Sequence, residues 1–377
     1  MRTHEPRHVR SLHAVTRFRA GGSEEDIARL VARELDAGWS VTVATGAESD
    51  PQRLEELGAR VESLPTLRRS IDPLDDFRSF RALRRLIRRG GYDIVQTHQA
   101  KAGALGRLAA WGAPAFVVHH IHMASFGPGF GRPASAVNLA VERICARRTD
   151  LFVSVGGDLD ARYMGARVAS PEQIVRVRTP VALEPLFAVR GTKPLPVLSL
   201  REGAAMALAV GALEPRKRHG ELVRWLTPML REGTIDLVIC GDGPERAAIA
   251  AVARRLGVFD AVHLIGHQAD MPRIYAAADV VVHAAVTEGV CRVFVEALAA
   301  GRPLVVTAVE GVGDLPRSAP VTVVDRTGSR FCCAVAERLA DPGLPVHRAQ
   351  LEDWSPAEVD RQIHMFHTRI GFQGGHH

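Results

Sequence analysis

The chain has 377 residues, more than one hydrophobic core usually serves, so we expect two domains of nearly equal size. Hydrophobic residues make up 46% and aromatic residues 5%, without low-complexity segments, which excludes a fibrous or intrinsically disordered protein. The formal net charge of +6 suits anionic ligands. Arginine is scattered along the chain, however, so we expect no nucleic-acid partner.

The cysteine content indicates a reducing compartment. Five cysteines, an odd number, lack the spacing of a disulfide framework or a metal site. No apolar run reaches the roughly 20 residues that span a bilayer, and no apolar signal core follows the first residues. We therefore expect a soluble cytoplasmic protein, whose oligomeric state the sequence leaves open.

Short β-branched segments alternate with helical patterns in the first half, which predicts βαβ units and a parallel sheet. The expected strands there are residues 9–16, 41–44, 94–97, 116–121, 151–155 and 174–177. Four prolines then interrupt the pattern without a helical period, which predicts an interdomain linker over residues 181–203. The alternation resumes with expected strands at residues 206–210, 237–240, 262–265, 280–283, 304–307 and 321–324.

This organisation predicts an α/β protein with two Rossmann-like domains facing each other across a cleft. The first spans residues 1–180 and the second spans residues 204–361. Ser355 as N-cap and Pro356 at the first helical position predict a last helix that runs to about Ile370. Ligands are expected beyond the carboxyl ends of the strands.

Residues 78–89 combine an apolar helical face with many arginines. Such a helix rests weakly on an anionic membrane or lies solvated on the protein surface. The second interpretation is favoured, because an expected strand follows directly at residues 93–95.

Two glutamates eight residues apart make residues 287–301 the most informative segment. Glu296 lies in an otherwise apolar helix, where an unpaired carboxylate costs several kcal/mol. Glu288 precedes that helix, beside Gly289. The backbone amides expected to point into the space between the two acids are those of Val290, Cys291 and Arg292. Such a space suits an anion flanked by hydroxyl groups, as in a nucleoside diphosphate sugar. The alternative is a helix whose Glu296 simply reaches water.

Three further segments precede this one in a fixed order: Val210–Lys217 (VGALEPRK), residues 239–244 (ICGDGP) and residues 264–267 (LIGH). Together with the paired glutamates they resemble the retaining glycosyltransferases of family 4. The resemblance covers most of the chain. It implies the GT-B fold, with a C-terminal helix at about residues 362–377 returning to the N-terminal domain. It also implies a nucleoside diphosphate sugar as substrate, with no metal and no cofactor.

The resemblance assigns the donor side of the site. Lys217 would neutralise the departing diphosphate, Glu288 would bind hexose hydroxyls and Glu296 would bind ribose hydroxyls. The other donor positions are Gly21, Gly22, Arg216, Gly241, Gly243, Ile265, Gly289, Val290, Cys291 and Arg292. The chain departs from the family at Ala212, where an arginine usually contacts the phosphates, so Arg216 or Arg292 would have to compensate.

The resemblance also places a catalytic histidine near the sugar. His122 matches it, although Met123 stands where glycine is usual. A metal site built from His119, His120 and His122 is disfavoured, because neighbouring strand residues point to opposite faces and no acid or cysteine completes the set.

The acceptor candidates are acidic and basic side chains in the first half. Behind the two glycines at residues 21–22, Glu24 and Glu25 would suit a cationic acceptor such as an amino sugar or aminocyclitol. Ser23 with Asp26 is expected to cap the helix there. Residues 97–109 resemble members that act on bacterial glycans. The remaining acceptor candidates in that segment are His98 and Lys101.

The resemblance therefore implies transfer of a hexose-type sugar, from a UDP-sugar by preference, to an acceptor hydroxyl with retention of configuration. A nucleotide-sugar hydrolase or epimerase of the same fold is one alternative. A noncatalytic nucleotide-sugar binder is another, suggested by the unusual residues Ala212, Ala285 and Met123. An NAD-dependent Rossmann enzyme ranks last, because no G-x-G-x-x-G turn follows the first expected strand.

Overall fold

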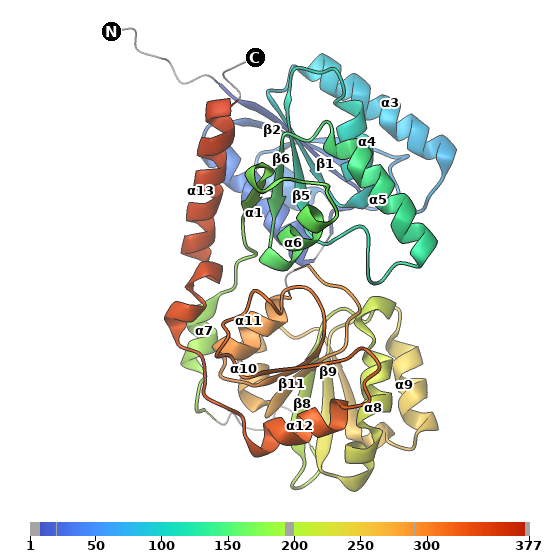
Figure 1. The fold of residues 1–377 in the computed structure, drawn as a ribbon, viewed down its shortest axis with the longest axis vertical. Helices are drawn as coiled ribbons and strands as arrows, with labels where there is room; N and C mark the ends of the chain where they lie inside the picture. Colours follow the sequence, from blue (N-terminus) through green and yellow to red (C-terminus); the bar gives the residue numbers. More distant parts are fainter. Residues whose placement is uncertain (1–7, 20, 193–199, 290, 374–377) are drawn as a thin grey trace. The chain divides into compact units, whose positions relative to one another are not determined.

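The computed structural model describes residues 8–19, 21–192, 200–289 and 291–373. The chain divides into two compact units, each with its own parallel sheet (Figure 1). The first unit combines Met1–Thr179 with Ala357–His377, and the second is Pro180–Pro356.

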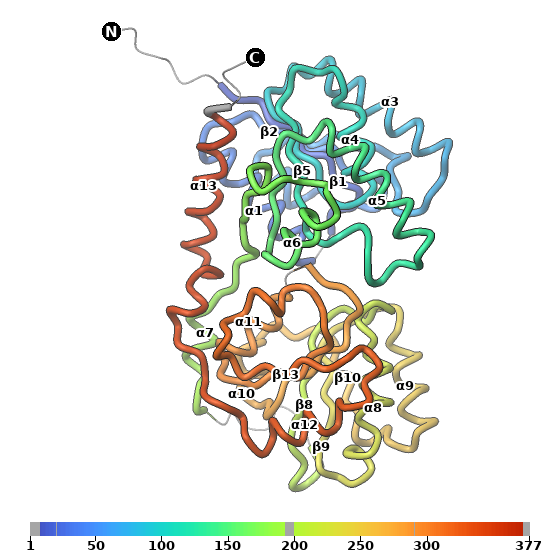
Figure 2. The backbone as a smooth tube through the Cα atoms, viewed as in Figure 1, coloured from blue at the N-terminus to red at the C-terminus, as the bar shows by residue number. Residues whose placement is uncertain are grey.

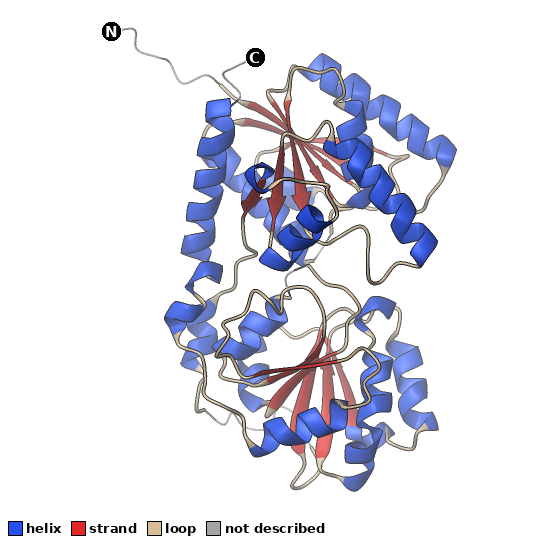
Figure 3. Ribbon diagram, in the orientation of Figure 1, coloured by secondary structure: helices blue, strands red, loops and turns tan. Residues whose placement is uncertain are grey.

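The first unit is built around a seven-stranded parallel sheet in the order β3-β2-β1-β4-β5-β6-β7. Its strands are β1 (Arg10–Val15), β2 (Ser40–Gly46), β3 (Arg60–Leu64), β4 (Ile94–His98), β5 (Phe116–Ile121), β6 (Leu151–Ser154) and β7 (Ile174–Arg176). Its helices are α1 (Gly22–Asp36), α2 (Gln52–Glu56), α3 (Pro73–Gly90), α4 (Ala100–Ala109), α5 (Arg132–Ala146), α6 (Gly157–Gly165) and α13 (Pro356–Gln373). Strands β4, β5 and β6 are buried along their whole length, as expected where helices cover both faces of a parallel sheet (Figure 3).

Strand β3 was not among the expected strands. It pairs in parallel with β2 at the edge of the first sheet. Only Val61 and Leu64 in it are apolar, and most of its side chains are at least partly exposed. An edge strand of this composition lacks the β-branched run by which the inner strands are predicted.

The last helix packs on the first unit. Helix α13 begins at Pro356, as predicted. Its apolar side chains pack against strands of the first sheet, and the buried ones are Val359, Ile363, Phe366 and Ile370. Asp360 forms ion pairs with Arg29 and Arg33 of α1, so helices far apart in sequence lie side by side (Figure 2).

The second unit has a six-stranded parallel sheet in the order β10-β9-β8-β11-β12-β13, the strand order of a Rossmann fold. Its strands are β8 (Ala205–Val210), β9 (Ile235–Cys240), β10 (Val262–Gly266), β11 (Val280–His283), β12 (Leu304–Thr307) and β13 (Val321–Val324). Its helices are α7 (Leu183–Ala188), α8 (His219–Glu232), α9 (Arg246–Arg255), α10 (Met271–Ala277), α11 (Arg292–Ala299) and α12 (Phe331–Ala340). All the strands expected in this half are present.

The segment expected to be a linker contains a helix. Leu183 and Leu186 of α7 are buried and join the core that contains Phe294 of α11. Its apolar residues Leu183, Leu186 and Phe187 have helical spacing, but six residues in a proline-rich segment are too few to reveal a helical period. Residues 193–199 of the expected linker lie outside the described residues.

Candidate active site

Glu288 is the centre of a charged group in the second unit. It lies between β11 and α11 and is only 6% exposed. Lys217 Nζ lies 2.5 Å from its Oε1, and Arg216 Nη1 lies 3.2 Å from its Oε2. Burial raises the pKa of Glu288, but Lys217 and Arg216 outweigh burial and hold the pKa below its ordinary value. Glu288 is therefore an ionised carboxylate held by two cations.

The local backbone brings these cations to Glu288. Lys217 and Arg216 lie on the 3₁₀ turn Pro215–Lys217, which follows β8. The amide of Val286, in the loop after β11, donates to the Arg216 carbonyl at 3.0 Å. The carboxyl ends of β8 and β11, which are neighbours in the sheet, are thereby joined.

His283 and Cys291 complete the surroundings of Glu288. His283 Nε2 lies 3.2 Å from Glu288 Oε1 and 3.3 Å from Cys291 Sγ. Within the described residues, a ligand atom from each of the three side chains lies within 4.8 Å of the other two, as in a metal site. Burial, with a contribution from Glu288, raises the pKa of Cys291 to about 12, so its sulfur is a thiol and not the thiolate that metals prefer. Burial and the Lys217 charge lower the pKa of His283 to about 3, so its ring is neutral. The Lys217 ammonium also contacts Glu288 on the oxygen that would face a metal ion.

The second glutamate of the pair has a protein partner that sequence reasoning missed. Tyr275 of α10, which is fully buried, donates from its hydroxyl to Glu296 Oε2 at 2.7 Å. Arg292 Nε lies 3.5 Å from Glu296 Oε1. The alternative in which Glu296 simply reaches water is therefore wrong. No sequence signal indicated Tyr275, because a tyrosine in an apolar helix is usually a core residue.

The arginines expected to compensate for Ala212 already contact carboxylates. Arg216 contacts Glu288, and its Nε lies 3.0 Å from Glu214 Oε2. Arg292 contacts Glu296. Either arginine must therefore exchange or share a carboxylate partner in order to contact a phosphate.

Two of the glycines predicted to bind the donor are also required by the packing of the backbone around them. Gly241 has a φ of 142°, and a Cβ atom there would lie 2.1 Å from the carbonyl oxygen of Gly211. A Cβ atom on Gly243 would lie 2.7 Å from the carbonyl oxygen of Leu213. The loops after β8 and β9 touch backbone to backbone at these glycines. Among the other predicted donor positions, Ile265 packs against the core of this unit and Val290 lies outside the described residues.

Gly241→Ala should destabilise the second unit by about 1–3 kcal/mol, because backbone must move to admit the methyl group. The free energy of unfolding in urea measures this loss. Gly257→Ala is a matched control, since Gly257 also has a positive φ, of 66°, but no atom lies within 4 Å of the added Cβ. Equal losses in the two variants would show that the contact between the loops does not require glycine.

In the first unit, the glycine pair starts helix α1. Gly21 is the N-cap without a side-chain bond, and Gly22 is the first helical residue. The predicted cap by Ser23 and Asp26 is therefore wrong, because the helix begins before either residue. Ser23 Oγ donates to Glu24 Oε2 at 2.8 Å instead.

The acceptor candidates have different surroundings. Glu24 is buried, whereas Glu25, the next residue of α1, is exposed. Lys101 Nζ lies 2.5 Å from Asp76 Oδ1 and also donates to the carbonyl oxygen of Ser70. An anionic acceptor group at Lys101 would compete with Asp76. The acceptor roles of Glu24, Glu25 and Lys101 stay predictions.

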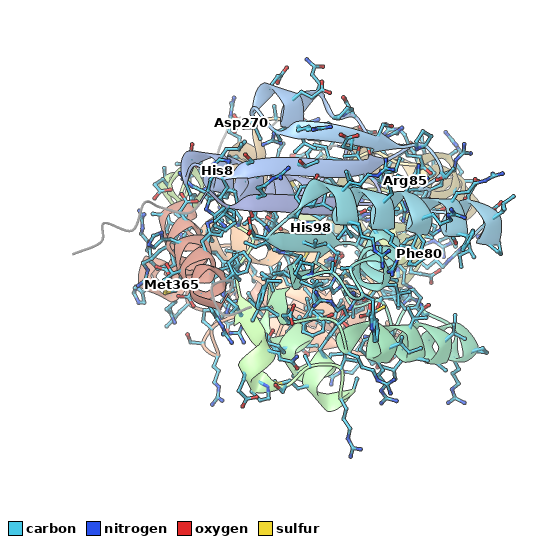
Figure 4. The ribbon with its side chains drawn as sticks, turned by 90° about the horizontal axis from the view of Figure 1, so that it is seen from above. His8, Phe80, Arg85, His98, Asp270 and Met365 are labelled. Atoms are coloured by element: carbon cyan, nitrogen blue, oxygen red, sulfur yellow. The ribbon has the colours of Figure 1, made fainter. Side chains whose placement is uncertain are left out.

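His122 follows β5 and contacts another histidine. Its Nε2 lies 3.1 Å from Nδ1 of His98, the last residue of β4. His98 is fully buried, so the prediction that it contacts an acceptor directly is wrong (Figure 4 labels it on the sheet). An interior strand end leaves its ring no route to solvent, and its Nδ1 contacts His122 instead.

The neighbouring histidines point to different partners. His119 Nδ1 lies 2.9 Å from Thr97 Oγ1, and His120 Nε2 lies 2.7 Å from Gln96 Oε1. This alternation along β5 is the one expected of a strand.

Comparisons with known proteins agree with this fold. Residues 21–180 match the family described as Glycosyl transferase 4-like domain, and residues 204–341 match the family described as Glycosyl transferases group 1. The two matches together cover most of the chain. The protein therefore belongs to the family 4-like glycosyltransferases with the GT-B fold.

Solved structures of low sequence identity share the fold. The crystal structure of Anabaena Alr3699/HepE in complex with UDP is 19% identical, with a TM-score of 0.74 over 96% of this chain and 100% of that chain. WaaG, a glycosyltransferase involved in lipopolysaccharide biosynthesis, is 17% identical, with a TM-score of 0.68 over 96% of this chain and 99% of its own. These likenesses confirm the predicted fold class.

Two curated relatives are more similar in sequence. The Escherichia coli UDP-Gal:alpha-D-GlcNAc-diphosphoundecaprenol alpha-1,3-galactosyltransferase is 27% identical over 256 residues, which are 66% of this chain and 66% of the relative. The D-inositol 3-phosphate glycosyltransferase of Salinispora arenicola is 28% identical over 294 residues, which are 69% of this chain and 64% of the relative. The chain thus spans slightly less than two thirds of the length of either relative.

Within the described part of the chain, no helix is both long enough and apolar enough to cross a membrane.

Proposed function

We propose that the protein transfers a hexose-type sugar from a nucleoside diphosphate sugar to an acceptor hydroxyl. The observation that carries this proposal is the ionised Glu288, held by Lys217 and Arg216, with Glu296 eight residues further along the chain. Family membership gives this arrangement its interpretation, because paired glutamates with a donor-site lysine are the motif that the resemblance rests on. UDP is the favoured nucleotide, since the Escherichia coli relative is named for a UDP-sugar and the Anabaena protein was crystallised in complex with UDP.

The proposed roles on the donor side follow from charge. Lys217 and Arg216 neutralise the negative charge that grows on the diphosphate as the sugar leaves. Glu288 then accepts hydrogen bonds from hexose hydroxyls and Glu296 accepts them from ribose hydroxyls. Bound hydroxyls would share Glu288 with its two cations and Glu296 with Tyr275.

We further propose that transfer retains the anomeric configuration through a front-side displacement. The bond from the sugar to the leaving phosphate breaks, the acceptor oxygen bonds to the same face, and the phosphate takes the acceptor proton. Catalysis then consists of positioning and of stabilising the departing charge. Because Lys217 and Arg216 supply the positive charge, the reaction is proposed to need neither a metal ion nor a cofactor.

On the acceptor side, His122 is proposed to lie near the sugar, and Glu24, Glu25 and Lys101 are proposed acceptor contacts. The acidic residues favour an amino sugar or aminocyclitol, whereas Lys101 favours a bacterial glycan with an anionic group. The names of the two relatives include a lipid diphosphate sugar and an inositol phosphate, so both classes belong in an acceptor screen.

A noncatalytic nucleotide-sugar binder is the second candidate. The observation that favours it is that Arg216 and Arg292, the arginines expected to compensate for Ala212, are both paired with carboxylates, which leaves the diphosphate with less free positive charge.

The proposal is tested by incubating the protein with UDP-, dTDP- and GDP-sugars, with and without a panel of acceptors. We expect UDP release that depends on an acceptor, a product with the anomeric configuration of the donor by NMR, and an unchanged rate in a chelator. Release of UDP without acceptor would indicate a hydrolase instead. If the protein binds a nucleotide but transfers no sugar to any acceptor, the result would support the noncatalytic binder.

A further inference from the structure

A line of hydrogen-bonded side chains connects a buried carboxylate to His122 within the first unit. Glu34 Oε2 lies 2.9 Å from His13 Nε2, and His13 Nδ1 lies 3.0 Å from His98 Nε2. His98 Nδ1 lies 3.1 Å from His122 Nε2. Glu34, His13 and His98 are fully buried, so none of them reaches a substrate. We call these four residues the Glu34 chain.

Glu34 is ionised at the inner end of the chain. Burial raises its pKa, but His13, by charge and hydrogen bond, and a hydrogen bond from Gln96 hold the pKa below its ordinary value. A carboxylate accepts hydrogen bonds and donates none, so the proton between Glu34 and His13 belongs to His13 Nε2.

The charge of Glu34 also requires a cation, because an unpaired buried carboxylate costs several kcal/mol. Within the described residues, the two ionisable side chains that pair with Glu34 are His13 and His367. His367 Nε2 is 3.8 Å away, and burial lowers the pKa of His367, which leaves it neutral. His13 is then the side chain placed to supply this cation, and with both ring protons it donates from Nδ1 to His98 as well as from Nε2 to Glu34.

This assignment fixes the remaining protons. Burial and the neighbouring histidines hold the pKa of His98 well below its ordinary value, so His98 carries one proton. Because His13 donates to His98 Nε2, that one proton lies on His98 Nδ1. His98 in turn donates to His122 Nε2, which must offer a lone pair, and the proton of His122 lies on Nδ1.

We propose that Glu34, His13 and His98 are positioning residues that hold His122 as a hydrogen-bond donor at Nδ1. Among the described residues, His122 Nδ1 has no hydrogen-bond partner, and the nearest carboxylate oxygen is Asp26 Oδ2 at 3.8 Å. The donor at Nδ1 is then available to an oxygen atom of the sugar or of the leaving phosphate. This use rests on the proposed function, whereas the proton positions do not.

Four other titratable groups face the Glu34 chain from the surrounding elements. They are Asp26 of α1, His119 and His120 of β5, and His367 of α13. Burial holds the pKa of both β5 histidines well below the ordinary value, so they add no charge to the chain.

The wild-type protein tests the proton positions directly. Long-range ¹H–¹⁵N correlation NMR distinguishes the two neutral tautomers of a histidine from each other and from the imidazolium. Spectra of His13→Gln and His122→Gln identify the two signals. We expect a His13 imidazolium and a neutral His122 with its proton on Nδ1. A neutral His13, or a His122 proton on Nε2, would overturn the proposal.

Glu34→Gln tests whether Glu34 sets the tautomer of His122, because it keeps the shape of the side chain and removes its charge. His13 should lose its extra proton, and the His122 proton should move to Nε2. Asp160→Asn is the matched control, because Asp160 is a buried carboxylate of the same unit that contacts Arg176 outside the chain. It should leave the His122 signal unchanged. If Glu34→Gln does not fold, His98→Gln serves in its place. It removes the hydrogen bond that links the Glu34–His13 pair to His122, and it should leave His122 without a fixed tautomer. An unchanged His122 signal in the folded variant would refute the proposal.

Activity separates this inference from the proposed function. If the protein is a glycosyltransferase, Glu34→Gln should lower kcat by about 10- to 100-fold with little change in the donor KM, the cost of losing a carboxylate behind a metal-ligating histidine. A protein that gives the expected NMR signals but binds no nucleotide would contradict the proposed function. The inference about the Glu34 chain would still stand. An active transferase in which His122 has the same tautomer in wild type and in Glu34→Gln would contradict only the inference about the Glu34 chain.

Discussion

Lys217→Met should reduce sugar transfer by about 100- to 1,000-fold, the usual cost of removing one group that stabilises transition-state charge. Lys217 Nζ is 2.5 Å from Glu288, so the variant loses the cation that would meet the departing diphosphate and also releases Glu288 from its closest partner. The effect should fall mainly on kcat, because the charge grows as the sugar leaves. Initial rates over a range of donor concentrations measure it.

Arg224→Met is the matched control for this variant. Arg224 is an exposed cation of α8 whose Nε lies 3.2 Å from Glu221, away from the paired glutamates. A folded Lys217→Met protein that turns over as fast as Arg224→Met would contradict the role of Lys217.

Glu142→Gln should lower the free energy of unfolding by about 3–5 kcal/mol, since it leaves a buried arginine without its counter-charge. Arg107 of α4 is fully buried, and its Nη2 donates to Glu142 Oε2 of α5 at 2.9 Å. Ser125 Oγ donates to the other carboxylate oxygen at 2.8 Å. Urea unfolding of the variant measures the loss.

Two further variants separate the charge from the fold around it. Glu62→Gln removes a half-buried partner of the exposed Arg60 in the same unit and should cost less than about 1 kcal/mol. The double variant Arg107→Met/Glu142→Leu removes both buried charges and should recover most of the lost stability. A Glu142→Gln protein as stable as Glu62→Gln would show that the buried pair does not hold α4 to α5.

The sequence predicts the sheets well because their inner strands are buried apolar runs, most of them rich in β-branched residues. Strand β3 escapes prediction because an edge strand needs no such run. Helix α7 escapes because it has only six residues, within a proline-rich segment. The hydrophobic period used for prediction is absent from β3 and too short to recognise in α7.

The charged residues of the candidate site are predictable only in part. Glu296 is visible because a carboxylate in an apolar helix conflicts with its surroundings, and Glu288 is visible because it lies just before that helix, beside a glycine. Tyr275 is an aromatic residue in an apolar helix, and nothing local distinguishes it from a core residue. The same holds for His13 and Glu34, whose connection depends on the packing of α1 against β1 and on contacts between residues 21 positions apart.

Binding of a nucleoside diphosphate tests the central claim most directly. Thermal unfolding is measured with UDP, dTDP, GDP, ADP and NAD for wild type, for Glu296→Ala and for the control Glu337→Ala, an exposed glutamate of α12. A ligand at 100 times its Kd adds about 2.7 kcal/mol of stability. We predict that UDP stabilises wild type and Glu337→Ala and that Glu296→Ala loses this response. No stabilisation by any nucleoside diphosphate, or an unchanged response in Glu296→Ala, would contradict the assignment of the paired glutamates to a donor site.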